Sequence, residues 1–216
     1  MKEKNILTIE TSLGRVFLVL FKNKSIFYTT SSSSKSIEEV INSLIEKVFS
    51  EAQIEFTKLD LILVSLGPGS FTGIRIGISA AKAMSLATGA KIIGFSNFQS
   101  IINQFFFKNI DKKKQKVEVL VKGPGEEFFK QIFNKEKEEK NISIITKNKL
   151  IKDNQEYPNT LRIGDFTNNF GLKNYYLSLP DYKGFEKLAF EYKNNGNFLF
   201  KTNLTPMYVK KHYAKK

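Results

Sequence analysis

Short apolar segments and brief polar turns alternate over the first thirty residues of the chain. Asn5–Glu10, Arg15–Lys22 and Ser25–Thr30 are rich in β-branched and aromatic residues, and only a few polar residues separate them. Apolar runs of this length, bounded by turn residues, are typical of strands. The pattern therefore predicts three strands joined in an antiparallel meander.

The hydrophobic period becomes helical after a serine-rich loop. Ser36 and Glu39 have the spacing of a capping box, and apolar residues then recur at three- and four-residue intervals as far as Phe49. Hydrophobic patterns of the same kinds predict strands at 59–66 and 91–95 and helices at 72–87 and 97–107. The predicted order, βββαβαβα over residues 1–107, is typical of a ribonuclease-H-like lobe of the kind that actin-like ATPases contain twice.

The second half of the chain has weaker patterns. Val117–Val121 and Glu127–Asn134 flank a Gly-Pro-Gly turn and indicate a hairpin, and helix-like spacing returns at Phe185–Tyr192. Shorter apolar runs at 142–145 and 161–164 indicate strands. We therefore expect an α/β protein with a first lobe at 1–107, a reduced second lobe at 108–200 and a basic tail at 201–216.

Composition excludes several kinds of chemistry. The 216 residues contain no cysteine and one histidine, His212, which excludes disulfides, thiolate zinc sites, cysteine nucleophiles and any mechanism with two histidines. The N-terminus runs directly into a strand-like segment, without a signal-peptide pattern, and the longest apolar run, Val16–Phe21, is too short for a membrane span. These features predict a soluble cytoplasmic protein that does not contact membranes.

The charge allows two interpretations. The formal net charge is +13, and 31 of the 34 basic residues are lysines. Residues 108–152 carry 13 basic against 7 acidic residues, and residues 201–216 carry 5 basic and none acidic. This surplus is either a solvated lysine surface or a direct RNA contact through Lys108–Lys116 and the tail.

One glycine-rich turn stands between a predicted strand and a predicted helix. Residues 67–77 read GPGSFTGIRIG, which could present backbone amides to a phosphate, but the Lys-Ser/Thr ending of a Walker A loop is missing. Residues 61–110 contain no Asp or Glu, so no carboxylate there could bind magnesium. A serine hydrolase built on Ser70 would have only His212, in the basic tail, as its base. We expect no catalytic residue and no metal site in this chain.

The helix at 72–87 has two apolar stripes, Ile74–Ile78–Ala81 and Ile76–Ala80–Ala83–Ala87. Gly73, Gly77, Ala80 and Met84 add a ridge of mostly small side chains. One stripe can pack on the sheet. The other can pack within the chain or against a protein partner, and the pattern does not distinguish the two.

Three segments together resemble the TsaB (YeaZ) family. The segment 67–77 is similar to that family's glycine motif, here Gly67, Pro68, Gly69, Ser70, Phe71, Thr72, Gly73 and Arg75. Residues 6–12, ILTIETS, resemble its first strand, and residues 206–210, PMYVK, resemble its C-terminal segment. Three places depart from the family pattern: Glu10 replaces an Asp, the loop 31–36 lacks a His-Ser, and residues 122–125 replace a basic stretch.

The resemblance implies an actin-like (ASKHA) fold of two ribonuclease-H-like lobes, the second reduced, without a working ATPase site. It implies a non-catalytic subunit that binds TsaD and, with TsaE, supports formation of threonylcarbamoyladenosine beside the tRNA anticodon. Nucleotide and metal would then be bound by the partner subunits, with no cofactor on this chain. The implied partner contacts are Ile37, Val40, Ile41, Leu44, Gly73, Ile76, Gly77, Ala80 and Met84.

Two points stay open at this stage. The residues do not decide whether two copies of the chain pair through the same helices. An actin-like ATPase or phosphotransferase with its own nucleotide site is the alternative function, using the turns at 10–14 and 67–73. That alternative needs a second phosphate turn, for which Gly164-Asp165-Phe166-Thr167 is a poor candidate.

Overall fold

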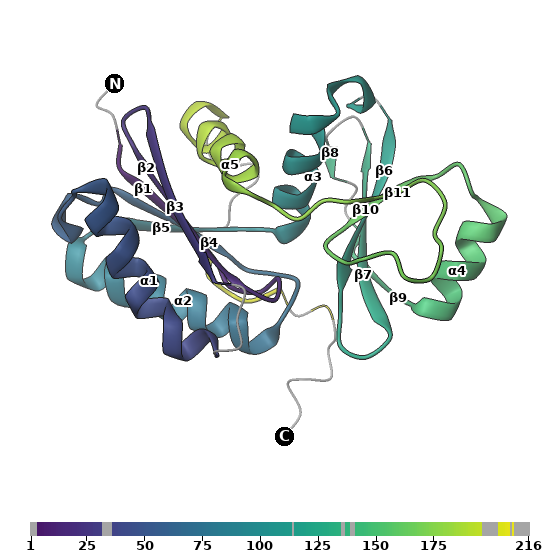
Figure 1. Cartoon of the computed structure of the whole chain (residues 1–216), viewed down its shortest axis with the longest axis horizontal. Helices are drawn as coiled ribbons and strands as arrows, with labels where there is room; N and C mark the ends of the chain where they lie inside the picture. Colours follow the sequence, from purple (N-terminus) through teal and green to yellow (C-terminus); the bar gives the residue numbers. More distant parts are fainter. Residues whose placement is uncertain are drawn as a thin grey trace.

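Two β-sheets with helices on both faces form the described part of the chain (Figure 1). The structure is a computed structural model that describes residues 4–31, 36–113, 115–134, 137–138, 141–195, 203–207 and 209. The strands are β1 (Ile6–Glu10), β2 (Val16–Lys22), β3 (Ser25–Ser31), β4 (Leu61–Ser65), β5 (Lys91–Phe95), β6 (Lys116–Lys122), β7 (Glu127–Asn134), β8 (Lys137–Glu138), β9 (Ser143–Thr146), β10 (Leu161–Gly164) and β11 (Tyr175–Leu177). The helices are α1 (Ile37–Ala52), α2 (Phe71–Thr88), α3 (Asn97–Lys108), α4 (Lys147–Glu156) and α5 (Tyr182–Asn195), with 3₁₀ turns η1 (Phe56–Lys58) and η2 (Ile110–Lys112).

The first sheet has the strand order β3-β2-β1-β4-β5. The meander of β1, β2 and β3 is antiparallel, whereas β4 and β5 run parallel to β1. Every residue of β1 and β4 is buried, since helices cover both faces of these strands. Helices α1 and α2 pack on one face around Leu7 and Val64, and α5 packs on the other around Ile6 and Leu63.

The second sheet has the order β11-β10-β6-β7-β8, and β9 also pairs with β7. The pairs β6–β10 and β10–β11 are parallel, and β6–β7 is the hairpin expected around Gly123-Pro124-Gly125. Helix α3 covers one face, where Phe98 and Ile102 pack against Val119. Helix α4 covers the other through Leu150. The fold prediction, a two-lobed actin-like α/β protein, is confirmed.

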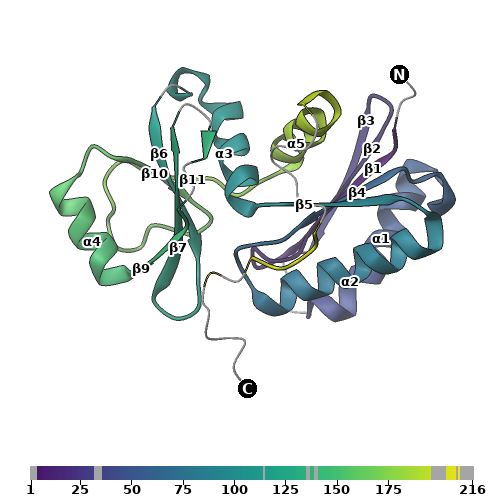
Figure 2. The same cartoon turned by 180° about the vertical axis from the view of Figure 1, so that it is seen from behind.

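The two sheets exchange helices. Helix α3 follows the first sheet in sequence but packs on the second, whereas α5 follows the second sheet and packs on the first through Phe185 and Leu188. The two helices lie side by side between the sheets (Figures 1 and 2). Residues 1–107 and 108–200, expected to form separate lobes, therefore each contribute a helix to the other. A hydrophobic period shows that a helix has an apolar face but not which sheet that face covers.

Residues 203–207 are partly packed against the first sheet. Met207 donates its amide hydrogen to the carbonyl oxygen of Leu66 (2.8 Å), and Leu204 and Met207 contact the first core. Val209 packs against the core of the second sheet. Part of the expected basic tail thus joins the two lobes, while His212 and the lysines around it lie outside the described residues.

Most predicted elements are present with boundaries shifted by one or two residues. Three were missed: α4, β8 and β11. Helix α4 buries only Leu150 and Asn154, so it lacks an apolar stripe, and β11 is a three-residue edge strand. Among the helices of the described ranges, none has both the length and the apolar character that a bilayer span requires.

Candidate functional site

Glu10, the last residue of β1, organises the turn that leads into β2. Its Oε1 accepts hydrogen bonds from the amides of Ser12 (2.6 Å) and Leu13 (3.1 Å) and from the Ser12 hydroxyl (2.8 Å). Complete burial raises the pKa of the Glu10 carboxyl above its ordinary value, although these hydrogen bonds and the charge of Arg15 oppose the rise. Oε1 therefore holds the turn, whereas Oε2 is buried without a hydrogen-bond partner.

A buried polar network joins that turn to two other loops. The side-chain amide of Asn97 donates to the Ser12 hydroxyl (2.7 Å) and to the carbonyl oxygen of Pro68 (2.8 Å). The Ser65 hydroxyl donates to the amide oxygen of Asn97 (2.7 Å). Asn97 begins α3, Ser65 ends β4 and Pro68 lies in the glycine turn, so one amide group fixes three loops in a site with little solvent.

Three backbone amides of the glycine turn donate hydrogen bonds within the chain. The Gly67 amide donates to the Ser65 hydroxyl (3.1 Å), the Ser70 amide to the Ser12 carbonyl (2.8 Å), and the Gly73 amide to the Ser70 hydroxyl (3.2 Å). A phosphate-binding loop presents such amides to its ligand. These three donors are not available to a phosphate.

Gly73 and Gly77 face the turn after β1. A Cβ atom on Gly73 would collide with the carbonyl oxygen of Thr11, and one on Gly77 would collide with the Thr11 hydroxyl. That hydroxyl donates to the Gly73 carbonyl (2.7 Å). These two glycines, expected at a partner interface, instead let α2 approach its own sheet. Ile41, expected at the same interface, is buried in the first core.

The other six expected interface residues lie on the outer side of the first lobe. Helices α1 and α2 run side by side on the face of the first sheet opposite α5 (Figures 1 and 2). We call the partly exposed apolar positions along them the α1–α2 seam: Ile37, Val40, Leu44, Ile76, Ala80 and Met84. Ala83 and Ala87 beside the seam are exposed, and Leu86 is 89% exposed. The α1–α2 seam therefore connects the first core with the protein surface.

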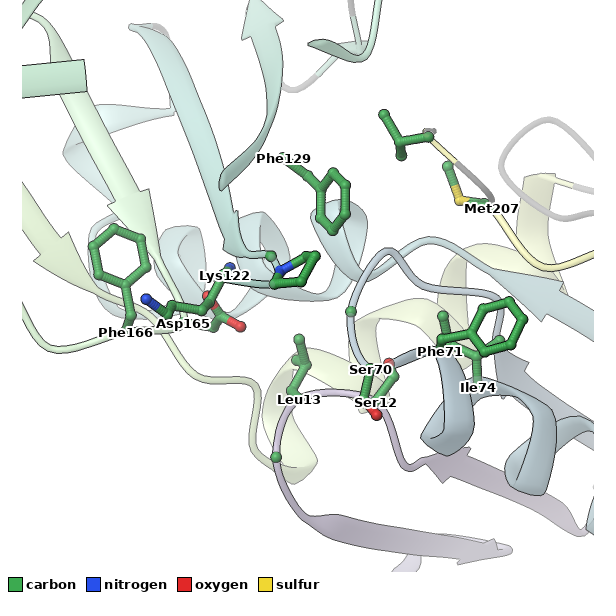
Figure 3. Close-up of a pocket in the computed structure, with 15 residues that line it drawn as sticks. Ser12, Leu13, Ser70, Phe71, Ile74, Lys122, Phe129, Asp165, Phe166 and Met207 are labelled. Carbon is green, nitrogen blue, oxygen red and sulfur yellow. The ribbon is translucent and has the colours of Figure 1, made fainter. Parts of the chain in front are cut away.

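A cavity of about 520 Å³ lies between the lobes (Figure 3). The first lobe contributes Ser12, Leu13, Ser70, Phe71 and Ile74, the second contributes Lys122, Phe129, Asp165 and Phe166, and Met207 adds a wall from the C-terminal segment. The lining is predominantly apolar. In the part of the chain that the structure describes, no group of three or more histidines, aspartates or glutamates could hold a metal ion.

Asp165 is the carboxyl group among the residues that line this cavity. The amide of Lys122 donates to its Oδ1 (2.8 Å), and burial raises the pKa of the Asp165 carboxyl to about 6. The structure therefore brings the weak candidate turn at 164–167 against the unusual segment 122–125. A carboxyl that gains a proton near pH 6 and stands without other carboxyl groups is a poor magnesium ligand.

Asn97 belongs to this site although no sequence motif includes it. It is 85 residues from Ser12 and 29 from Pro68, and only the fold brings the three loops together. Nothing in its local pattern distinguishes it from other asparagines. Ser12 and Ser70 were included because they stand in the motifs, and the structure links them directly.

The comparisons with known proteins agree with the fold. The model of the family "TsaD: tRNA N6-adenosine threonylcarbamoyltransferase" matches residues 30–159, more than half of the chain. The structure of "YeaZ from Pseudomonas aeruginosa" superposes with a TM-score of 0.75 at 14% identity, covering 96% of this chain and all of that one.

Sequence relatives carry two names. The tRNA threonylcarbamoyladenosine biosynthesis protein TsaB of Buchnera aphidicola from Schizaphis graminum is 35% identical over 117 residues, which cover 54% of this chain and 55% of that protein. The TsaB from the Acyrthosiphon pisum strain is 27% identical, with 90% of this chain and 97% of that protein covered. A tRNA N6-adenosine threonylcarbamoyltransferase of Dictyoglomus turgidum is 37% identical over 91 residues, which span 27% of that longer protein.

Proposed function

The chain belongs to the TsaB (YeaZ) family, and on that basis we propose that it is a non-catalytic subunit in the formation of threonylcarbamoyladenosine in tRNA. It binds a TsaD-family transferase and, together with a TsaE-family ATPase, keeps that transferase active. The transferase and the ATPase carry the nucleotides and the metal, and tRNA is engaged by the complex.

The α1–α2 seam is the observation that carries this proposal. It combines partly exposed branched residues with Ala80, whose small side chain lets a partner helix approach closely. The seam is continuous with the first core, so a partner packed on it would extend that core. Ile41, Gly73 and Gly77 support the seam from inside and do not contact the partner.

The closed glycine turn supports the non-catalytic part of the proposal. Gly67, Ser70 and Gly73 use their amides internally, and Oε1 of Glu10 accepts three hydrogen bonds from its own turn. These are the positions at which an actin-like nucleotide site would need free donors and a free carboxylate.

Light scattering on mixtures of this chain with the TsaD-family protein from the same organism tests the association. Ala80→Arg places a long cation in the seam and should abolish the heterocomplex while leaving the thermal midpoint nearly unchanged. Ser79→Arg is the matched control, because Ser79 is exposed on the polar side of the same helix turn. Normal association by folded Ala80→Arg would rule out the seam as the interface. Light scattering on the chain alone shows whether two copies pair, and loss of that pairing in Ala80→Arg would place it at the seam.

The interlobe cavity favours the alternative, an ATPase or phosphotransferase with its own site. At about 520 Å³ it has the volume of a small-molecule pocket. Its apolar lining and single carboxyl group fit a magnesium-bound triphosphate poorly. Calorimetry with Mg-ATP on the isolated chain should show no binding, and tight magnesium-dependent binding would favour the alternative.

A further inference from the structure

A fully buried arginine holds a loop at the end of the second sheet that is distant from the interlobe cavity. Arg162 on β10 is 1% exposed, and its Nε lies 2.9 Å from Oε2 of Glu118 on β6. Nη1 of the same guanidinium donates to the carbonyl oxygens of Tyr157 (3.1 Å) and Thr160 (3.4 Å). The ion pair with Glu118 holds the guanidinium in place, and the guanidinium in turn holds the carbonyl groups of Tyr157 and Thr160.

Further hydrogen bonds pin the same loop. The side-chain amide of Asn174 donates to the carbonyl oxygen of Asn159 (2.9 Å), and the Thr160 amide donates to the Tyr157 carbonyl (3.3 Å). A buried arginine thus holds a surface loop that takes no part in the interlobe site. A loop held this firmly can present its side chains in a fixed arrangement.

The fixed loop forms one wall of a groove of about 590 Å³, and Gln115 and Lys116 contribute to the other wall. Because β6 and β10 are parallel, this groove lies at their N-terminal ends, whereas the interlobe cavity lies at their C-terminal ends. The two sites are therefore separate.

The groove is lined by a tyrosine ring, by neutral polar groups and by one charge of each sign, Lys116 and Glu156. Tyr157 is 58% exposed and is followed by Pro158, which offers a second flat apolar surface. Gln115 and Asn159 are exposed amides that can both donate and accept hydrogen bonds. The carboxylate in the lining, Glu156, hydrogen-bonds the Tyr157 hydroxyl and raises the pKa of that phenol.

The basic segment 108–116 leads into this groove. It contains five lysines against one aspartate, and Lys116 itself lines the groove. Ile110 in this segment is 70% exposed, and Phe107 directly before the segment is 52% exposed. The exposed rings of Phe107 and Tyr157 thus lie beside a lysine-rich segment, and rings next to cations are typical of surfaces that bind single-stranded nucleic acid.

We propose that this groove binds an unpaired segment of RNA, with a base stacked on Tyr157 and the phosphates following the described lysines Lys108, Lys112, Lys113 and Lys116. The inference rests on the proposed function, in which the complex acts on tRNA, and it assigns this chain a direct RNA contact. Lysine suffices here, because unpaired bases are recognised by stacking and by amide hydrogen bonds, and phosphates need only point charges. A duplex keeps its bases stacked internally and therefore offers no base to the Tyr157 ring.

Fluorescence anisotropy of the full chain with a fluorescein-labelled ten-nucleotide RNA, single-stranded or annealed to its complement, tests this proposal. The single strand should bind tighter than the duplex, with affinity that falls as salt rises. Tyr157→Ala should weaken single-strand binding roughly tenfold or more, through the lost stacking, whereas Tyr157→Phe should retain it. Lys116→Ala should lower the slope of log affinity against log salt by about 0.7, and Lys58→Ala, on the first lobe, should not.

Equal affinity for the duplex, or unchanged RNA binding by a folded Tyr157→Ala protein, would overturn the proposal. It would also be overturned if poly-L-glutamate displaced the labelled RNA as strongly as unlabelled RNA does, because the groove would then bind acidic protein ligands equally well. Heterocomplex formation with the TsaD-family protein is measured separately by light scattering. Its failure would contradict the proposed function without affecting the anisotropy result. A Tyr157→Ala protein that still forms the heterocomplex but loses RNA binding would support this site alone.

Discussion

Gly73→Ala tests whether the glycine motif serves packing in this protein. The new methyl group would meet the Thr11 carbonyl oxygen and the Ser12 Cα, which are backbone atoms and cannot rotate away. Displacing the start of α2 should cost about 1–3 kcal/mol, as other overpacked sites do. It would also weaken the buried Thr11–Gly73 hydrogen bond, worth about 1 kcal/mol. The better helix propensity of alanine offsets less than about 1 kcal/mol. We expect a net loss of about 2–3 kcal/mol.

Thermal denaturation followed by circular dichroism measures this loss. For a chain of this length it corresponds to a fall in midpoint of about 5–10 °C. Gly125→Ala is the matched control, because a Cβ atom added at Gly125, where φ is 61°, would meet no other atom within 4 Å. It should cost about 1 kcal/mol, from backbone conformation alone. A Gly73→Ala protein no less stable than Gly125→Ala would refute the packing argument.

Two further substitutions test charged groups. Folding raises the pKa of Asp165 from 3.8 to about 6, so the folded chain binds more protons than the unfolded chain between these values, and stability falls as pH rises through them. Asp165→Asn removes this loss and should stabilise the protein by about 1–2 kcal/mol more at pH 7.5 than at pH 4, measured from thermal midpoints. A stability difference between variant and wild type that does not change with pH would contradict the raised pKa of Asp165. Glu118→Gln leaves buried Arg162 without its anion and should lower stability by about 3 kcal/mol in urea titrations. Glu126→Gln is the control at the exposed ion pair with Lys147, and it should change stability by less than about 0.5 kcal/mol. Equal losses in the two variants would show that the buried pair does not stabilise the protein more than the exposed one.

Local patterns predicted the elements that carry a strong signal. The meander β1–β3 follows from apolar runs between turn residues, and α1 and α2 follow from apolar residues at helical spacing. Helix α4 was missed because its charged sequence buries little, and its position depends on β9 and on the core around Leu150. Weak local patterns of this kind become ordered only through contacts with the rest of the chain.

The candidate site was predictable in part. The motif residues Ser12 and Ser70 do meet, since both belong to loops at the end of the first sheet. Gly73 and Gly77 were assigned to a partner surface because a glycine ridge on a helix reads the same whether a partner or the chain's own backbone packs on it. Only the position of Thr11 resolves that ambiguity.

The sequence by itself determined the kinds of element, their order along the chain, the family motif and the exclusion of cysteine and two-histidine chemistry. Tertiary structure decided which sheet α3 and α5 cover, where the glycine-turn amides donate, and that Arg162 lies buried beneath the loop at 157–160. The physical reason is the separation in sequence over which each kind of interaction acts. Hydrophobic period and turn preference act between neighbours in sequence, whereas the Asn97–Ser12 and Arg162–Glu118 contacts join residues 85 and 44 positions apart. Such pairs exist only once the sheets have formed.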